Sequence, residues 1–296
     1  MVRGQIYPDH NPLREAFMVT FRVVSRFLAV TALFGLMACG SKAPEAAKTP
    51  EDAVNRVVEG LKKNEPVVLW DALPKSYQAD VNGVIGEFAS KMDAEVYNKA
   101  MAVFGKAVKV AKDKKDLIMQ MADSPMGGAL PMPKDQLKSQ YGNVTDAMGA
   151  VADSNIKTLD GLKGLDVRKF LEGPGAKVMN TAMVMAKAAP IPVKPEMLNS
   201  VKAEKGAAEG MVKITANGKT EEIKFVKVDE KWIPEDMSKA WPQAIAEMKK
   251  EMAGLGEMAK QKDMILKQLD QADKMLDALA KAEKPEDLMK AMGGGM

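Results

Sequence analysis

The spacing of apolar residues changes twice along this chain of 296 residues, and the changes limit what it can fold into. Between 51 and 188 apolar side chains recur every three or four positions, as on one face of an α-helix. Between 196 and 234 they alternate as in a strand, and from 235 to 292 helical spacing returns. We therefore predict an α+β fold, mostly helical, with a small antiparallel three- to four-stranded meander and a long C-terminal helix.

Capping and breaking residues divide the first helical region. Thr49 can cap a helix whose first residue is Pro50, and Asp93 can cap another. Gly173-Pro174 is expected to interrupt a late helix. Further helices are predicted over 134–152, 156–163, 166–172 and 174–188, with a loop over 123–133 and a candidate subdomain boundary over 189–195.

Turn residues fix the predicted meander. Its strands are expected over 200–204, 211–216 and 220–228, with a possible short fourth strand at 231–233. Asn217-Gly218 is a strong type I′ hairpin signal. In the third strand Phe225 and Val226 are both apolar although they point to opposite faces, which predicts either a bulge near Phe225 or a strand buried on both faces.

The C-terminal region carries a heptad-like pattern. Leu255, Lys262, Leu269 and Leu276 recur every seven residues. Two interpretations remain open: a long helix that packs on its own domain, and a helix that dimerises or binds a protein partner. Lys262 at a seam position weighs against a long coiled coil.

A short apolar segment near the N-terminus has the layout of a secretory signal. Arg22 and Arg26 precede an apolar stretch over 27–38, which is too short to cross about 30 Å of hydrocarbon comfortably. The chain's single cysteine, Cys39, follows at once. Residues 1–17 are polar and contain two prolines, which does not fit a signal peptide. We therefore interpret them as an extension that results from a wrongly assigned start codon, with Met18 as the true start.

The sequence Leu36-Met37-Ala38-Cys39 resembles the lipobox of bacterial lipoproteins. The resemblance implies that 18–38 is a cleaved signal peptide and that the Cys39 thiol carries a diacylglyceryl group. It also implies acylation of the new amino terminus, typically with palmitate, and dependence on the lipoprotein-processing and sorting machinery. Residues 39–50 would then be the lipidated cysteine and a flexible tether to the membrane. The alternative is a chance cysteine at the end of an ordinary signal peptide or signal anchor.

The residue after Cys39 bears on localisation. It is Gly40 rather than an aspartate. In a double-membraned bacterium the resemblance then implies an outer membrane lipoprotein facing the periplasm. Separately, the hairpin region that ends in 225–234 resembles, over about thirty residues, the final strands of cystatin-like and nuclear-transport-factor-like folds, which hold apolar ligands or partners.

The composition argues against several chemistries. The only histidine, His10, precedes Cys39, so the mature chain would lack His-based triads and His-liganded metals. The mature chain is also nearly neutral, which gives no reason to expect a nucleic-acid partner. The remaining candidate acids and bases are three carboxylate pairs: Asp93 with Glu95, Glu221 with Glu222, and Glu235 with Asp236. Each pair can instead cap a helix, form a turn or face solvent.

Methionine is unusually frequent, with 24 residues. Thioether binding of Cu(I) is conceivable, but no His or Cys accompanies these residues, and adaptable core packing is favoured. We predict no catalytic, cofactor or metal-binding residues and a non-enzymatic envelope lipoprotein with a protein-binding or structural role. The alternative is a periplasmic carrier of a small apolar ligand in a Met-lined pocket. Trp70, Trp232 and Trp241 are interpreted as core anchors.

Overall fold

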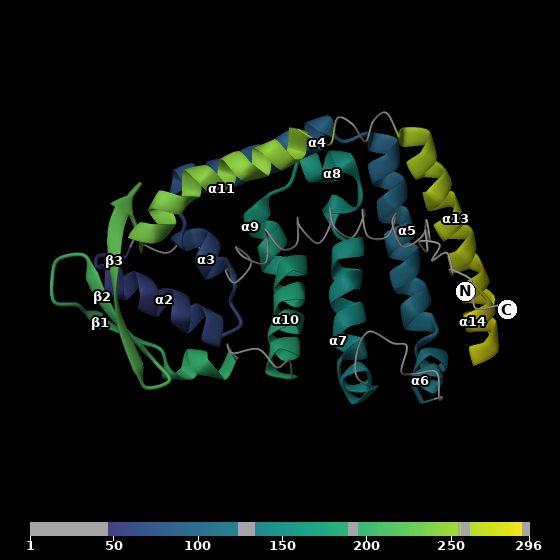
Figure 1. The fold of residues 1–296 in the computed structure, drawn as a ribbon, viewed down its shortest axis with the longest axis horizontal. Helices are drawn as coiled ribbons and strands as arrows, with labels where there is room; N and C mark the ends of the chain where they lie inside the picture. Colours follow the sequence, from purple (N-terminus) through teal and green to yellow (C-terminus); the bar gives the residue numbers. More distant parts are fainter. Residues whose placement is uncertain (1–46, 124–133, 189–194, 254, 256–260, 292–296) are drawn as a thin grey trace, which may run out of the picture.

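The computed structural model describes residues 47–123, 134–188, 195–253, 255 and 261–291 (Figure 1). Within these ranges the chain is mostly helical and carries one four-stranded antiparallel sheet followed by helices. The predicted α+β class is therefore confirmed. The predicted loop over 124–133 and the proline-rich stretch over 189–194 lie outside the described residues.

The helices before the sheet follow the predicted caps closely. Thr49 accepts a hydrogen bond from the Asp52 amide, and Asp93 accepts from the amides of Glu95 and Val96. The longer helices are α2 (Pro50–Lys62), α4 (Lys75–Lys91), α5 (Ala94–Asp113), α6 (Lys115–Asp123), α7 (Lys134–Ala152) and α10 (Ala176–Ala188). Shorter ones are α3 (Val67–Ala72), η2 (Asn155–Lys157), α8 (Leu159–Lys163), α9 (Val167–Phe170) and η4 (Pro195–Ser200).

The sheet is a simple meander in the order β1-β2-β3-β4. Its strands are β1 (Lys202–Lys205), β2 (Met211–Ala216), β3 (Lys219–Val228) and β4 (Lys231–Pro234). Asn217 and Gly218 have φ values of 51° and 73°, so the predicted two-residue turn has positive φ at both central positions. Asp229 and Glu230, at 45° and 62°, make the second tight turn.

The sheet lies between two apolar clusters. On one face Val212 and Phe225 are buried and pack with Val54 of α2. On the other face Val226 packs with Ile233 against the main core, which includes α11 (Glu235–Ala253). Residue pairing from β2 to β3 is continuous from 211↔224 to 216↔219. Of the two alternatives for β3, the structure therefore shows a strand covered on both faces around Phe225 and Val226, because α2 and α11 lie on opposite sides of it, whereas residues 219–222 are exposed.

The main core joins the sheet to helices α3, α4, α8 and α11. Trp241 of α11 stacks on Tyr77 of α4, with ring centroids 4.0 Å apart and planes 5° apart. The Trp241 indole also donates a 2.8 Å hydrogen bond to Asp80. Trp70 and Trp241 are buried in this core, which agrees with their interpretation as anchors.

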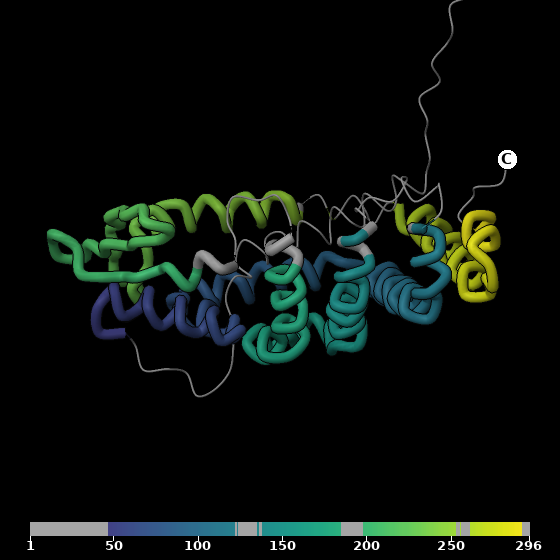
Figure 2. The backbone as a smooth tube through the Cα atoms, turned by 90° about the horizontal axis from the view of Figure 1, so that it is seen from below, coloured from purple at the N-terminus to yellow at the C-terminus, as the bar shows by residue number. Residues whose placement is uncertain are grey.

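Beyond this core the molecule continues as a row of helices. In Figures 1 and 2, α10, α7, α5 and α13 (Lys262–Lys281) lie next to one another in one layer, and each packs on its neighbour. α4 and α11 run together along the edge of the molecule from the sheet toward this row. The sheet and α13 consequently lie at opposite ends of an elongated molecule.

Two sequence expectations differ in detail from the structure. Gly173-Pro174 does not end the helix, because residues Leu171–Gly175 form a π-helical turn that leads directly into α10. The C-terminal region is helical but divided into α11, α13 and α14 (Pro285–Ala291), and α11 packs on α4 whereas α13 packs on α5. Lys262 begins α13 and pairs with acidic groups of α5, so it does not occupy a buried seam.

Candidate functional site

The residues of the proposed lipidation site, Leu36, Met37, Ala38 and Cys39, lie outside the described residues. Their roles therefore stay predictions. The described chain begins at 47, and the Trp232 indole donates a 3.3 Å hydrogen bond to the Lys48 carbonyl. The predicted tether thus reaches the body beside β4, at the sheet end of the molecule.

The first carboxylate pair has a structural role. Asp93 caps α5, and the Lys262 ammonium lies 2.9 Å from Asp93 and 2.8 Å from Glu95. The Lys262 hydrogen bond and the donated backbone amides lower the pKa of Asp93. This pair therefore ties α13 to α5, and both carboxylates already have a cation beside them.

The other carboxylate pairs also do not converge on a cleft. Glu235 lies 2.9 Å from both Lys224 and Lys239, which lower its pKa through hydrogen bonds. Glu221 and Glu222 are consecutive exposed residues of β3, so their side chains point to opposite faces of the sheet. Within the described ranges, no group of three His, Cys, Asp or Glu side chains is arranged to hold a metal ion.

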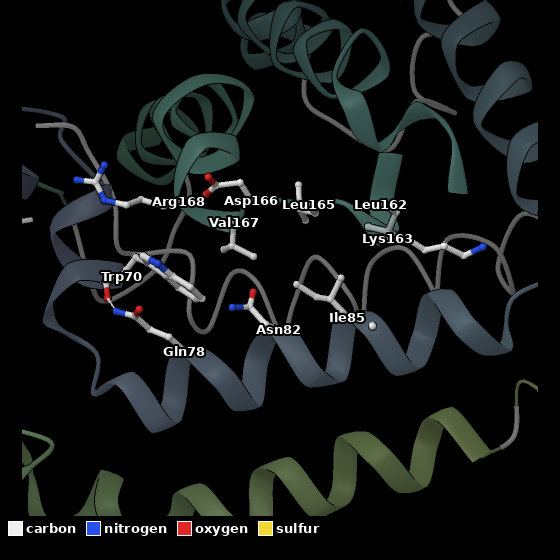
Figure 3. A pocket seen from close by; sticks show the side chains of 11 residues that line it. Trp70, Gln78, Asn82, Ile85, Leu162, Lys163, Leu165, Asp166, Val167 and Arg168 are labelled. Carbon is white, nitrogen blue, oxygen red and sulfur yellow. Dashed lines mark hydrogen bonds between the residues drawn. The ribbon is translucent and has the colours of Figure 1, made fainter. Parts of the chain in front are cut away.

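A hollow of about 300 Å³ lies between α4 and the segment that joins α8 to α9 (Figure 3). One wall is a face of α4 that includes Gln78, Asn82 and Gly86. These residues are spaced by four, so they follow one another along the helix. Trp70, Leu162, Leu165 and Val167 contribute apolar side chains to the rest of the lining and Ile85 does so from α4, but most of the surface exposed in the hollow is polar.

The charged residues at the hollow already have counter-ions. Lys163 lies 3.4 Å from Asp160, and Asp166 lies 3.5 Å from the Lys169 ammonium and accepts a 3.0 Å hydrogen bond from the Lys169 backbone amide. That backbone hydrogen bond is the main cause that lowers the pKa of Asp166. Both pairs are exposed to solvent, so they are weak and leave the charges accessible.

The side-chain amides of Gln78 and Asn82 on α4 differ from each other in their hydrogen bonds. Gln78 uses its Nε2 group to donate to the carbonyls of Trp70 and Leu73, at 2.8 and 3.2 Å. Asn82 is exposed and makes no hydrogen bond with any residue in the described part of the chain. A side chain with two donors and a carbonyl acceptor thus faces the hollow unused.

Gly86 adds no side chain to the α4 side of the hollow. A Cβ atom built on Gly86 would meet nothing within 4 Å, and the same holds for Gly83 one turn earlier on α4. Glycine inside a helix costs about 0.5 to 1 kcal/mol relative to alanine. Packing within the described chain therefore does not explain either glycine. Of the two, Gly86 lines the hollow and Gly83 does not.

A partly buried ion pair lies at one end of the hollow. Arg168 binds Asp71 of α3 in a bidentate manner, with Nε to Oδ1 at 2.9 Å and Nη2 to Oδ2 at 3.0 Å. It also contacts Glu172 within the π-helical turn. The Asp71 side chain is 8% exposed, and its carboxylate raises the pKa of Arg168. This pair fixes α3 to the start of the helix row.

Methionine does not line this hollow. Met252 is buried in the main core, and among large apolar residues Met148 and Met264 are exposed at 38% and 50%. Met126 and Met132 lie outside the described residues. The hollow therefore gives no support to a Met-lined ligand pocket, while Met252 fits the role of core filler.

The sequence contained signals for this region that we did not use. Asp71 is a lone carboxylate within the apolar run Val67–Leu73, which suggests a buried partner. Gly83 and Gly86 interrupt an otherwise helical pattern, although no atom lies within 4 Å of either Cβ position. Neither signal identifies the residues that lie opposite α3 and α4, because Arg168 is 97 positions away from Asp71 in the sequence.

The comparisons with known proteins found no match: no known protein family, no curated protein and no solved structure is significantly similar to this chain.

Proposed function

We propose that this chain is a bacterial envelope lipoprotein, anchored through lipid on Cys39, whose body has a non-enzymatic, protein-binding role. The signal peptide is 18–38, and residues 39–50 tether the body to the membrane. In a double-membraned bacterium the protein faces the periplasm from the outer membrane. Its first partners are the membrane and the lipoprotein-processing and sorting machinery.

The observation that carries the anchor is the lipobox sequence ending at the chain's single cysteine, directly after a basic and apolar segment. The position of the first described helix agrees with it. Thr49 caps α2 ten residues after Cys39, so an extended tether spans at most about 35 Å. No helix among the described residues is sufficiently long and apolar to span a membrane.

The non-enzymatic role is supported by what the carboxylates do. Asp93, Glu95 and Glu235 serve a helix cap and ion pairs between elements rather than a shared cleft. These carboxylates already have cations beside them, and each such exposed pair contributes at most about 1 kcal/mol to stability. A protein-binding role then draws on exposed surfaces and on the hollow along α4.

The C-terminal helix α13 offers one such surface. Its inner side is held on α5 by Lys99 with Asp270 at 2.5 Å and by Lys106 with Asp273 at 2.8 Å. Its outer side carries the exposed Met264 and the exposed residues Lys267 and Lys274. The packing on α5 favours the first interpretation of the heptad pattern, a helix bound to its own domain, and leaves the outer side for a protein partner.

The anchor is tested by metabolic labelling. The full chain is expressed in its own host or a close surrogate with a clickable palmitate analogue, beside Cys39→Ala, and the products are analysed by gel and mass spectrometry. We expect label on a product that begins at Cys39 and none on the variant. An unlabelled wild-type product, or one that retains residues 18–38, would overturn the anchor.

A further inference from the structure

We propose that Asn217, at the tip of the hairpin between β2 and β3, is a site of spontaneous covalent modification in which the turn itself supplies the nucleophile. The backbone nitrogen of Gly218 attacks the side-chain amide of Asn217, and the asparagine becomes aspartate or isoaspartate. The inference is carried by the juxtaposition, at one turn, of an exposed amide, a glycine N–H outside the strand ladder and the Ser200 hydroxyl. It goes beyond the proposed function and does not depend on the anchor.

The reaction needs water and no other co-reactant. A bond forms between the Gly218 nitrogen and Asn217 Cγ, the proton of that nitrogen passes to solvent, and the side-chain nitrogen of Asn217 takes up a proton and leaves as ammonia. Water then opens the cyclic imide at one of its two carbonyls. One opening gives aspartate, and the other gives isoaspartate, whose main chain runs through the former side chain.

The chain carries the Asn-Gly dipeptide twice, which separates the effect of the fold from that of the sequence. Asn82-Gly83 lies inside α4, Asn217-Gly218 forms the turn, and all four residues are exposed. No atom lies within 4 Å of the Cβ position of either glycine. The two sites therefore differ mainly in their backbone structure.

Helix α4 protects Asn82. In the interior of an α-helix the N–H of Gly83 is held by the carbonyl four residues earlier, and the backbone dihedral angles are fixed. The Gly83 nitrogen cannot turn toward Asn82 Cγ unless a turn of the helix opens. Attack at this site is therefore slow while α4 is folded.

The hairpin turn leaves the Gly218 nitrogen available. Pairing of β2 with β3 ends at Ala216↔Lys219, so the Gly218 N–H lies outside the ladder. It makes no backbone hydrogen bond within the described part of the chain. Residues 217–222 are all exposed, so the turn at the end of the sheet in Figure 1 can flex without moving buried side chains.

Ser200 makes the Asn217 side-chain carbonyl a better electrophile. The Ser200 hydroxyl accepts a 3.0 Å hydrogen bond from the Asn217 backbone amide and donates one of 3.0 Å to Asn217 Oδ1. A donor at this oxygen stabilises the negative charge that develops there when the Gly218 nitrogen adds to Cγ, as in an oxyanion hole. Asn82 receives no such hydrogen bond from the described residues.

The products change the tip of the hairpin and leave its core intact. Isoaspartate adds a methylene group to the main chain of the turn, and both products add a negative charge. The hydroxyls of Thr215 and Thr220, 2.9 Å apart, are the nearest cross-strand side-chain contact and should loosen. The buried Val212 and Phe225 lie farther along the strands, so the modified protein should stay folded.

The experiment follows both sites in one sample. The full chain in detergent micelles is incubated at neutral pH and physiological temperature, and samples are digested with trypsin in heavy-oxygen water, which marks any conversion during the digest. Cleavage after lysine places the sites on separate peptides, 76–91 and 214–219. Mass spectrometry with electron-transfer fragmentation then counts asparagine, aspartate and isoaspartate at each site. A parallel sample in guanidinium chloride gives the rates without the fold.

We expect Asn217 to convert at least about tenfold faster than Asn82 in the folded chain, with isoaspartate among its products. In guanidinium chloride the two rates should agree within about threefold, because the dipeptide is the same. Ser200→Ala should slow Asn217 at least about threefold and leave Asn82 unchanged, and Ser200→Thr, which keeps the hydroxyl, should restore the rate. Circular dichroism melts check that both variants fold.

Three outcomes would overturn the inference. They are equal rates at the two sites in the folded chain, a faster rate at Asn82, or conversion of Asn217 to aspartate alone, which would show direct hydrolysis by water without attack by Gly218. An Asn217 rate that is unchanged or raised in Ser200→Ala would overturn the role of Ser200. If the Ser200 variants do not fold, the comparison of the two sites in wild type still decides.

Discussion

Removing Arg168 tests whether the buried ion pair joins the two parts of the molecule. Arg168→Ala leaves the Asp71 carboxylate, whose side chain is 8% exposed, without its bidentate partner. Breaking a buried pair from one side typically costs about 3 to 5 kcal/mol. The Arg168 side chain is 28% exposed, so water can reach the vacated position, and we expect the lower value, about 3 kcal/mol.

The assay is thermal unfolding of the full chain in detergent, followed by circular dichroism. For a chain of this size about 3 kcal/mol corresponds to a decrease in melting temperature of roughly 6 to 12 °C. Arg168→Lys keeps the charge but loses the planar fork, so its decrease should be intermediate. As a control, Lys109→Ala removes an exposed pair with Asp113 and should change stability by less than about 0.5 kcal/mol.

A double variant distinguishes a lost attraction from a stranded charge. In Asp71→Asn with Arg168→Ala the carboxylate is neutral, so part of the lost stability should return relative to Arg168→Ala alone. A melting temperature of Arg168→Ala within 1 °C of wild type would refute the reasoning. It would show that the ion pair contributes little to the free energy of unfolding.

Three further predictions use the same unfolding assay. Trp241→Ala removes the stack on Tyr77 and should cost about 3 to 5 kcal/mol, whereas Trp241→Phe should cost clearly less. Thr49→Ala removes the cap of α2 and should cost about 1 kcal/mol, and Thr49→Ser should restore it. Lys262 lowers the pKa of Asp93 below its ordinary value of 3.8. The stability that the charged Asp93 contributes is therefore present above pH 3.8 and is lost as the pH falls through the lowered pKa. Lys262→Met should make this loss of stability in acid smaller.

Local features of the fold were readable from the sequence. The caps at Thr49 and Asp93 form as predicted, because an acceptor side chain next to the first helical turn satisfies free amides wherever the helix later packs. Helix α7 has the predicted bounds, 134–152, and the turn at Asn217-Gly218 has the expected positive φ values. These features depend on a few neighbouring residues, so no knowledge of the tertiary structure is needed.

Contacts between distant segments were not readable. The heptad pattern from Leu255 to Leu276 suggested one seam, but Leu255 lies in the main core with α11 and Leu276 is buried in α13, which packs on α5. Helical spacing shows that a face is apolar and does not name the helix that covers it. The hollow depends on such pairings, because its two walls come from α4 and from the α8–α9 segment.

The single-layer row of helices has a consequence for how the protein opens. Each helix of the row packs mainly on its neighbours, as in a repeat protein, so stability is shared between adjacent pairs rather than concentrated in one centre. At the far end α13 packs chiefly on α5 and α14, while α5 is also held by α7. Native-state hydrogen exchange should therefore be fastest in α13 and α14 and slowest around the Tyr77–Trp241 stack. The body would then open stepwise from the end farthest from the proposed membrane attachment, and the end nearest the proposed tether would stay folded longest.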